Sequence, residues 1–560
     1  MTAPTLPLVA APRGGSCSGL AKPAPRKALG WACGRLGAWV LAVLLGLPGG
    51  VVPASAASLR IASAYDPQTM DPHSLALLYH TRVVFRIYEG LVGRDAQYRL
   101  EPALATEWRQ VDPLTWRFKL RPGVRFHDGT AFTADDVVFS IDRALAAPSQ
   151  RVFTLIGVKG ARQVDPLTVD ILLAAPDAVL PEKLPLVAMM SRRWCIAHGV
   201  ERAQDYNARQ ETFAVRNANG TGPYRLERYE PDTRTVLRSH AQWWGRGDKR
   251  NGNVDEATFV TIRSDATRLA ALTSGEVDLV LDPPYQDVDA LQHDARLAVS
   301  QITELGTDYL TFDQQSDTLP GLDPSLHGGR NPFKDLRVRR AVYQAINIDL
   351  IIQKVLKGLA KPTGALLPPL VDGNLPEFEN RLRYDPVAAR ALLAEAGYPK
   401  GFDITLSCLN VPWRERVCQA AAAMLTQSGI RTRLDTSPST QFYSLVSQGN
   451  PPFIEYGWTA TADAWASLNG LLHTRDGSGG GTFNAGRYAN PRMDALIDTV
   501  RTEGDLARRR AAVTAALRIE RDDLAYIPLY RRTLSWAMQK RVSVTMWPDD
   551  TLALRWAKVR

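Results

Sequence analysis

Few of the residues that usually carry chemistry stand at the spacing that the chemistry needs. The chain has eight histidines and five cysteines, but no two histidines are four residues apart and no Cys-x-x-Cys occurs, so the common zinc patterns are absent. His73 and His80 are seven residues apart and lack a carboxylate at a supporting spacing. We therefore expect no metal site and no cofactor.

Hydrolytic motifs are equally scarce. The sequence contains no Gly-x-Ser-x-Gly elbow. The His127-Asp128-Gly129 segment pairs an imidazole with a carboxylate, but adjacent residues in a turn point in different directions and no nucleophile is nearby. An Asp or Glu pair that only the fold brings together stays open. The prediction is a protein that is not an enzyme, with a secreted hydrolase as the rival class.

The first residues have the layout of a secretory signal peptide. A basic stretch precedes the apolar run Gly37–Leu47, and Ala54-Ser55-Ala56 follows as a small-residue cleavage site, which places cleavage after Ala56. A membrane anchor would need about 20 apolar residues, and Pro48 interrupts this run too early. The basic stretch is long, so translation could also start further downstream. We expect a soluble product outside the cytoplasmic membrane.

The net charge reads differently once this segment is set apart. Five of the 67 Lys and Arg residues and none of the 58 acidic residues lie within residues 1–56, so the formal charge of +9 falls to +4 for the remainder. A charge this small on so long a chain does not point to nucleic acid. Three cysteines remain after residue 56, namely Cys195, Cys408 and Cys418. Cys408 and Cys418 could form a disulfide or stay as two buried thiols.

The remaining chain alternates strand-like and helix-like segments. Residues 116–121 alternate apolar and polar side chains as a half-buried strand does, and Thr133 is placed to cap a helix that follows it. Asp385-Pro386 and Asn490-Pro491 each predict a helix start, with the proline in the first turn. Residues 402–406 and 527–530 are expected strands. The pattern indicates an α/β or α+β protein.

Several short segments, weak singly, together resemble the extracytoplasmic solute-binding proteins of ABC transporters, family 5, which bind oligopeptides, dipeptides, glutathione or nickel. They occur in the family's order over nearly the whole chain after residue 56. The segments are Arg86–Val92, Glu101–Trp108, Phe118–Thr130, Phe132–Val137, Asn219–Tyr224, Trp243-Trp244, Ser274–Asp278, Pro332-Phe333, Arg337–Val342, Arg487–Pro491, Asp494–Leu496 and Ile527–Tyr530.

The resemblance implies an α/β, two-lobed periplasmic-binding-protein fold of type II, with an extra domain inserted in the first lobe. Mapped onto this chain, the signal peptide is 1–56, the first lobe is 57–80, 186–305 and 529–560, the inserted domain is 81–185, and the second lobe is 306–528. It also implies a monomer that closes over a small-molecule or short-peptide ligand and delivers it to ABC permease subunits, without nucleic acid.

The resemblance also implies where the ligand lies. In peptide-binding relatives an aspartate three residues after a tryptophan pairs with the peptide's amino terminus. Trp458 matches that tryptophan, but the position three later is Thr461, so Asp463 is the residue that could substitute. Glu455 stands where the oligopeptide binder has an arginine, which favours a cationic or neutral ligand. The aromatic residues expected to line the site are Tyr309, Tyr456, Trp458 and Trp465.

The function expected from this resemblance is a periplasmic receptor for a peptide or peptide-like solute. A non-peptide solute such as an opine, a glycoside, a metal chelate or haem is the alternative within the binding class. Haem or nickel would require ligands that the sequence does not reveal.

Overall fold

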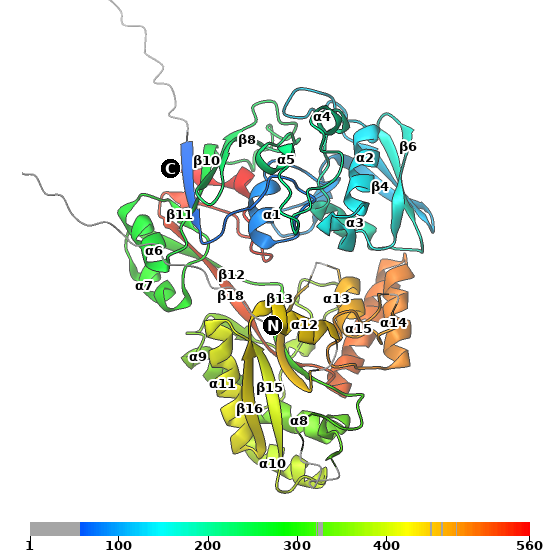
Figure 1. The fold of residues 1–560 in the computed structure, drawn as a ribbon, viewed down its shortest axis with the longest axis vertical. Helices are drawn as coiled ribbons and strands as arrows, with labels where there is room; N and C mark the ends of the chain where they lie inside the picture. The colour runs from blue at the N-terminus through cyan, green and yellow to red at the C-terminus, as the bar shows by residue number, and fades with distance from the viewer. Residues whose placement is uncertain (1–56, 321, 323–328, 449–450, 461–462, 478) are drawn as a thin grey trace, which may run out of the picture. The chain divides into compact units, whose positions relative to one another are not determined.

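The computed structural model describes residues 57–560 except 321, 323–328, 449–450, 461–462 and 478 (Figure 1). The expected signal peptide and its cleavage after Ala56 therefore lie outside the described residues. Among the residues described, no helix combines the length and the apolar character needed to span a bilayer.

One long, mixed sheet organises the chain. Its first part is built on β1 (Ala57–Ser63), which pairs in parallel with β10 (Val254–Thr261) and β11 (Leu279–Val280). The antiparallel strands β9 (Arg234–Ser239) and β8 (Tyr224–Glu230) extend this edge. A first core packs on these strands and includes Val83 and Val84 of α1 (Leu78–Val84). The predicted boundary between residues 80 and 81 falls inside this helix.

The second part of the sheet centres on β13 (Gly306–Phe312). This strand lies between β17 (Phe453–Thr459) and β18 (Ile527–Gln539), both antiparallel to it. Beyond β17 come the parallel strands β15 (Phe402–Leu409) and β16 (Ile430–Ser437). Two second-part cores flank this region. The helices that contribute to them include α8 (Leu336–Ala345), α9 (Ile348–Lys354), α10 (Pro386–Glu395), α11 (Pro412–Gln427), α13 (Trp465–Leu471), α14 (Pro491–Thr502) and α15 (Leu506–Asp523).

Strand β18 belongs to both parts of the sheet (red in Figure 1). Its beginning pairs with β13 and with β14 (Ala360–Pro362), and its end pairs with β12 (Leu297–Thr303) and β11. The predicted strand 527–530 is therefore confirmed and extends to Gln539. The predicted strand 402–406 is likewise confirmed, as part of β15.

A separate antiparallel sheet is formed by residues 105–173, which lie in the sequence between α1 and β8. Its order is β4 (Ala105–Asp112), β5 (Thr115–Leu120), β7 (Thr168–Leu173) and β6 (Val158–Asp165). The apolar face of α2 (Ala134–Leu145) packs against it in a core of its own. Thr133 and Asp136 form a capping box at the start of α2, which confirms the predicted cap.

The other two predicted helix starts are also confirmed. At α10 the Asp385 carboxylate accepts the backbone N–H groups of Val387 and Ala388. At α14 the Asn490 side chain accepts the N–H groups of Arg492 and Met493. In both helices a proline occupies the first turn, where a missing N–H costs no hydrogen bond.

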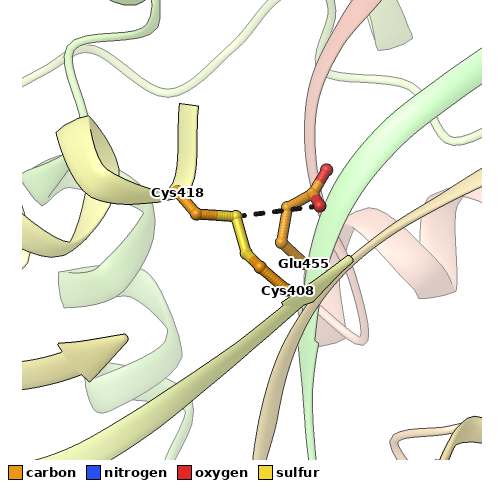
Figure 2. A group of neighbouring side chains, drawn as sticks. All are labelled: Cys408, Cys418 and Glu455. Carbon is orange, nitrogen blue, oxygen red and sulfur yellow. Dashed lines mark hydrogen bonds between the residues drawn. A yellow bond between two sulfur atoms is a disulfide. The ribbon is translucent and has the colours of Figure 1, made fainter. Parts of the chain in front are cut away.

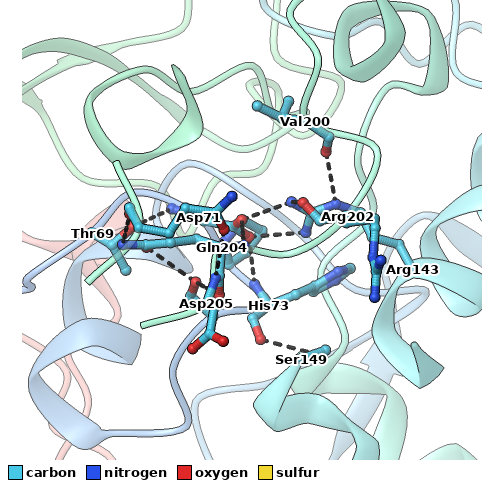
Figure 3. A network of polar contacts seen from close by, with 12 residues as sticks. Thr69, Asp71, His73, Arg143, Ser149, Val200, Arg202, Gln204 and Asp205 are labelled. Atoms are coloured by element: carbon cyan, nitrogen blue, oxygen red, sulfur yellow. Dashed lines mark hydrogen bonds and ion pairs between the residues drawn. The ribbon is translucent and has the colours of Figure 1, made fainter. Parts of the chain in front are cut away.

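A buried polar network fixes the loop between β1 and α1 (Figure 3). Arg143 of α2 donates two hydrogen bonds to Asp71, at 2.9 and 2.7 Å, and both side chains are fully buried. Burial alone would raise the pKa of Asp71, but the Arg143 guanidinium outweighs it and the pKa is about 2. His73 and His80 bond to backbone carbonyls within this network. Burial lowers both imidazole pKa values to about 3, so these histidines are neutral structural groups.

Cys408 and Cys418 form a disulfide, which resolves the alternative left open by the sequence. It joins β15 to α11, while Cys195 is a buried free thiol. A covalent tie between neighbouring strand and helix restricts the unfolded chain more than the folded one.

We predict that the double variant Cys408→Ala/Cys418→Ala loses about 3 kcal/mol of unfolding free energy, because the bridge closes a short loop of sequence separation 10. Urea unfolding followed by circular dichroism measures the loss. The wild-type protein unfolded in a strong reductant should approach the variant's midpoint. Identical midpoints for variant and oxidised wild type would contradict the prediction.

Candidate functional site

A cavity of about 950 Å³ opens between the segments of the first core and those of the second part of the sheet. The first side contributes the loop after β1, the start of α1, the start of α6 (Asp265–Ser274) and the loop after β11. The second side contributes the end of α9 and the start of α11, and β18 runs along the cavity. The lining residues include Ala64, Tyr65, Leu78, Asp265, Arg268, Leu281–Gln286, Lys354, Val355, Lys357, Val411–Trp413, Arg416, Arg532–Ser535 and Asp550.

Beside this cavity, Arg414 joins two buried carboxylates from neighbouring strands. Its guanidinium donates to Asp308 Oδ1 of β13 at 2.5 Å and to both oxygens of Glu455 of β17, at 3.0 and 3.1 Å. The side chains of Asp308 and Glu455 are 4% and 1% exposed. We call these three residues the Arg414 triad. It ties the first turn of α11 to the middle of the sheet.

Gly457 leaves the space that the Arg414 triad occupies. The residue lies opposite Asp308 in the β13–β17 register. A Cβ atom there would lie 2.6 Å from Asp308 Oδ1 and 2.9 Å from an Arg414 nitrogen, closer than real Cβ contacts allow. The glycine before Trp458 is thus explained by the close approach of a buried ion pair.

The triad contains two carboxyl groups and one guanidinium, and its titration reflects that imbalance. Burial raises the pKa of Glu455 to about 8, although Arg414 opposes the shift, and burial also raises the pKa of Asp308. One proton therefore stays with the carboxyl pair up to mildly alkaline pH. Glu455 does not present a free negative charge to a ligand.

Trp413 contacts the triad and also lines the cavity. Its ring lies 4.9 Å from the Arg414 guanidinium and 5.3 Å from that of Arg532, within the range of cation–π contact. Arg532 of β18 pairs with Glu304 at 2.6 Å. Tyr285 meets Trp413 edge to face at 6.3 Å from the other side of the cavity.

The described site residues predicted from the sequence lie in β13, in β17 and in the segment that leads into α13, and none of them lines the cavity. Tyr309 is fully buried and packs edge to face against Tyr456 at 6.0 Å. Trp458 donates its indole N–H to Ser467 Oγ at 2.9 Å. Thr461 lies outside the described residues.

Asp463 and Trp465 stand near residues 182 and 183. Asp463 is 9% exposed and accepts the backbone N–H of Ala466 at 3.3 Å. The Trp465 ring receives Lys183 of α3 (Leu180–Lys183) at 4.7 Å and Arg501 at 5.0 Å. Trp465 therefore joins α3 to the second part of the sheet, as an aromatic contact between the two.

Cys408, Cys418 and Glu455 bring their side-chain ligand atoms within 4.8 Å of one another (Figure 2). A soft metal ion would need thiolates, whereas here both sulfurs are bonded to each other and Glu455 is engaged by Arg414. The oxidised cluster does not fit a metal ion. Glu455 Oε2 lies 3.8 Å from Cys418 Sγ.

Sequence reasoning missed Trp413, Arg414, Arg416 and Arg532. Arg414 contacts residues that are 106 and 41 positions away in the sequence. No local spacing of residues could therefore have predicted these contacts. The Pro412 helix start was the available signal, because a helix that begins after a strand end often presents its first turn at a sheet edge.

Known proteins share this architecture. The chain is 27% identical over 495 residues to the glutathione-binding protein GsiB of Escherichia coli K12, covering 86% of this chain and 90% of that protein. The solved structure of the periplasmic binding protein DppA from Helicobacter pylori with the peptide STSA matches with a TM-score of 0.70 and 23% identity, over 90% of this chain and 98% of that one. HbpA2 from Haemophilus parasuis matches with a TM-score of 0.76 and 22% identity, over 90% and 100%.

The fold defined by these strands and the cavity between them is that of a two-lobed periplasmic binding protein. The profile of the bacterial extracellular solute-binding proteins, family 5, matches residues 99–479, more than half of the chain, and the chain belongs to that family. Members of the family are periplasmic substrate-binding components of ABC importers and not enzymes.

The titration of the Arg414 triad yields a prediction about pH. A carboxyl whose pKa is raised on folding contributes stability that is full below its unfolded pKa, near 4.5, and is lost as the pH rises through about 8. The wild-type protein should therefore lose unfolding free energy across this window, by up to about 1.4 kcal/mol per pH unit.

The variant Glu455→Gln should show a flatter dependence, because an amide cannot titrate. Thermal unfolding from pH 5 to pH 9 measures it. Glu107→Gln, on the exposed face of β4, is the matched control and should keep the wild-type slope. A wild-type slope in Glu455→Gln would show that the triad does not titrate in this window.

Proposed function

We propose that the protein is a periplasmic receptor that captures a peptide or peptide-like solute in the cavity between its lobes and delivers it to an ABC permease. The observation that carries this proposal is the cavity of about 950 Å³ walled by both lobes and by the shared strand β18. The glutathione named for GsiB and the peptide named for the DppA structure support a peptide-like ligand.

The mechanism follows from where the walls come from. A ligand that touches Tyr65 and Leu78 on one wall and Trp413 and Arg416 on the other gains contacts only when the walls are close together. It therefore favours the closed arrangement over the open one by its difference in affinity for the two. The lobe division proposed for this motion is the one predicted from the sequence, with the first lobe formed by 57–80, 186–305 and 529–560.

Asp463, which does not line the cavity, is the proposed partner for the amine of a ligand that extends beyond the cavity toward α3. It is an acid in the segment that follows Trp458. Its charge is close enough to Glu182 of α3 to add to the rise that burial causes in the pKa of that carboxyl. Glu182 is paired with Arg94 at 2.8 Å, so Asp463, and not Glu182, is the acid proposed to meet a cationic group there. Trp458, Tyr456 and Trp465 are the aromatic residues proposed to contact the ligand.

Native mass spectrometry of the freshly purified protein tests the proposed function. We expect a co-purified peptide mass, and we expect Asp463→Ala to reduce the bound fraction about tenfold, the loss of roughly 1.4 kcal/mol, with an unchanged melting temperature. Asp289→Ala, at an exposed position of α7 (Val288–His293), is the control. A bound compound that is not a peptide would contradict the proposed ligand class. Turnover of the bound compound would contradict the proposed receptor function.

Export by a cleaved signal peptide belongs to the same proposal. The basic stretch, the apolar run 37–47 and Ala54-Ser55-Ala56 support cleavage after Ala56. Amino-terminal sequencing of the exported protein should begin at Ala57. Replacing Ala56 by a bulky residue should leave the precursor uncleaved, and a mature protein that begins elsewhere would contradict the assignment.

A further inference from the structure

The acidic residues that line the interlobe cavity each contact an arginine, whereas several of its basic residues have no acidic partner among the described residues. Three acids line it, and each already has a cationic partner. Asp265 accepts from Arg268 at 2.7 Å, and Asp282 and Asp550 share Arg82 at 2.9 and 2.5 Å. Each of the three therefore contacts a guanidinium, and Asp282 and Asp550 share one.

The basic residues of the cavity differ in this respect. Arg268 and Arg532 are paired, with Asp265 and Glu304. Arg416, Lys354 and Lys357 also line the cavity, and among the described residues none of these three forms a hydrogen bond or an ion pair with its side chain. We call them the cavity cations.

The cavity cations come from one side. Lys354 ends α9, Lys357 follows it, and Arg416 lies in the second turn of α11, two residues after Arg414. The Arg414 triad and the disulfide at Cys418 fix that part of α11. The amino end of α11, which has no side-chain cap, adds a field of the same sign.

The facing wall carries exposed apolar and aromatic side chains beside its paired charges. Leu78 at the start of α1 is 40% exposed and Tyr65 is 58% exposed, although both are large apolar side chains. Trp413 and Tyr285 continue the aromatic surface across the cavity. Exposed apolar groups beside a cavity are typical of a surface that a ligand covers.

We propose that the interlobe cavity selects an organic anion, with a ligand carboxylate held by Arg416, Lys354 and Lys357 and an apolar portion held against Tyr65, Leu78 and Trp413. This rests on the proposed function and narrows it to carboxylate-bearing solutes. A guanidinium binds a carboxylate through paired hydrogen bonds, and the two ammonium groups add attraction without a fixed geometry. Because the cations are exposed at the cavity, their effect should weaken with salt.

This assignment reverses the expectation drawn from Glu455. Considered alone, an acid in place of an arginine favours a cationic or neutral ligand. Arg414 compensates Glu455, and the cavity that lies next to the triad carries the three cavity cations.

The test uses two pools of free acids and their methyl esters. One pool is a tryptic digest of casein, and the other is a set of aliphatic and aromatic carboxylic acids without peptide bonds. The full-length mature protein is incubated with each pool, separated by gel filtration, and the retained compounds are identified by mass spectrometry. We expect retention from the free-acid digest at least about tenfold above its ester.

Two triple variants distinguish an effect of the cavity cations from an effect of the protein's total charge. Arg416→Gln/Lys354→Gln/Lys357→Gln should reduce the retained acid at least about tenfold and remove most of its salt dependence. The control Lys400→Gln/Arg433→Gln/Arg492→Gln changes the same charge at exposed positions outside the cavity lining and should behave as wild type. Melting temperatures confirm that both triple variants are folded.

Each outcome bears on one of the two proposals. Equal retention of acids and esters overturns the anion inference and leaves the peptide receptor intact. Retention from the non-peptide acids alone supports the anion inference and overturns the peptide ligand. A cavity triple variant that retains acids as the wild type does overturns the assignment to these three residues, and retention from neither acid pool overturns both proposals.

Discussion

Asp308 and Glu455 project from adjacent strands into the same buried space, and Arg414 bonds to both. Removing one partner of a buried ion pair costs about 3–5 kcal/mol, because the remaining charge is left without compensation. The position of the first turns of α11 is therefore tightly fixed. Trp413 and Arg416 belong to the same turns and line the cavity, so the triad also fixes the position of this part of the cavity wall. The disulfide at Cys418 adds a second, covalent tie one turn further along.

Local chemistry predicted the elements whose ends are determined by their own residues. Asp385 and Asn490 cap α10 and α14 because their short side chains reach the free N–H groups of the next turn. Thr133 does so for α2. The ordered family segments then predicted the fold, since they occur along almost the whole chain. In each of these cases the information lies within a few residues or in a fixed order of motifs.

The candidate site could not be predicted in the same way, because its contacts join distant segments. Arg414 meets Asp308 and Glu455 across 106 and 41 positions, and the cavity is lined by residues from both ends of the chain. Glu455 shows the effect most clearly. Its charge suggested the sign of a ligand, whereas burial against Arg414 makes it part of the scaffold.

Strand β18 pairs with β13 and β14 at one end and with β11 and β12 at the other. It is also among the last segments of the chain, at residues 527–539. Neither half of the sheet is complete before these residues have been synthesised. The pairings that join the two parts of the sheet can therefore form only after residues 527–539 have been made, whereas the separate sheet with α2 has a core of its own that needs none of them.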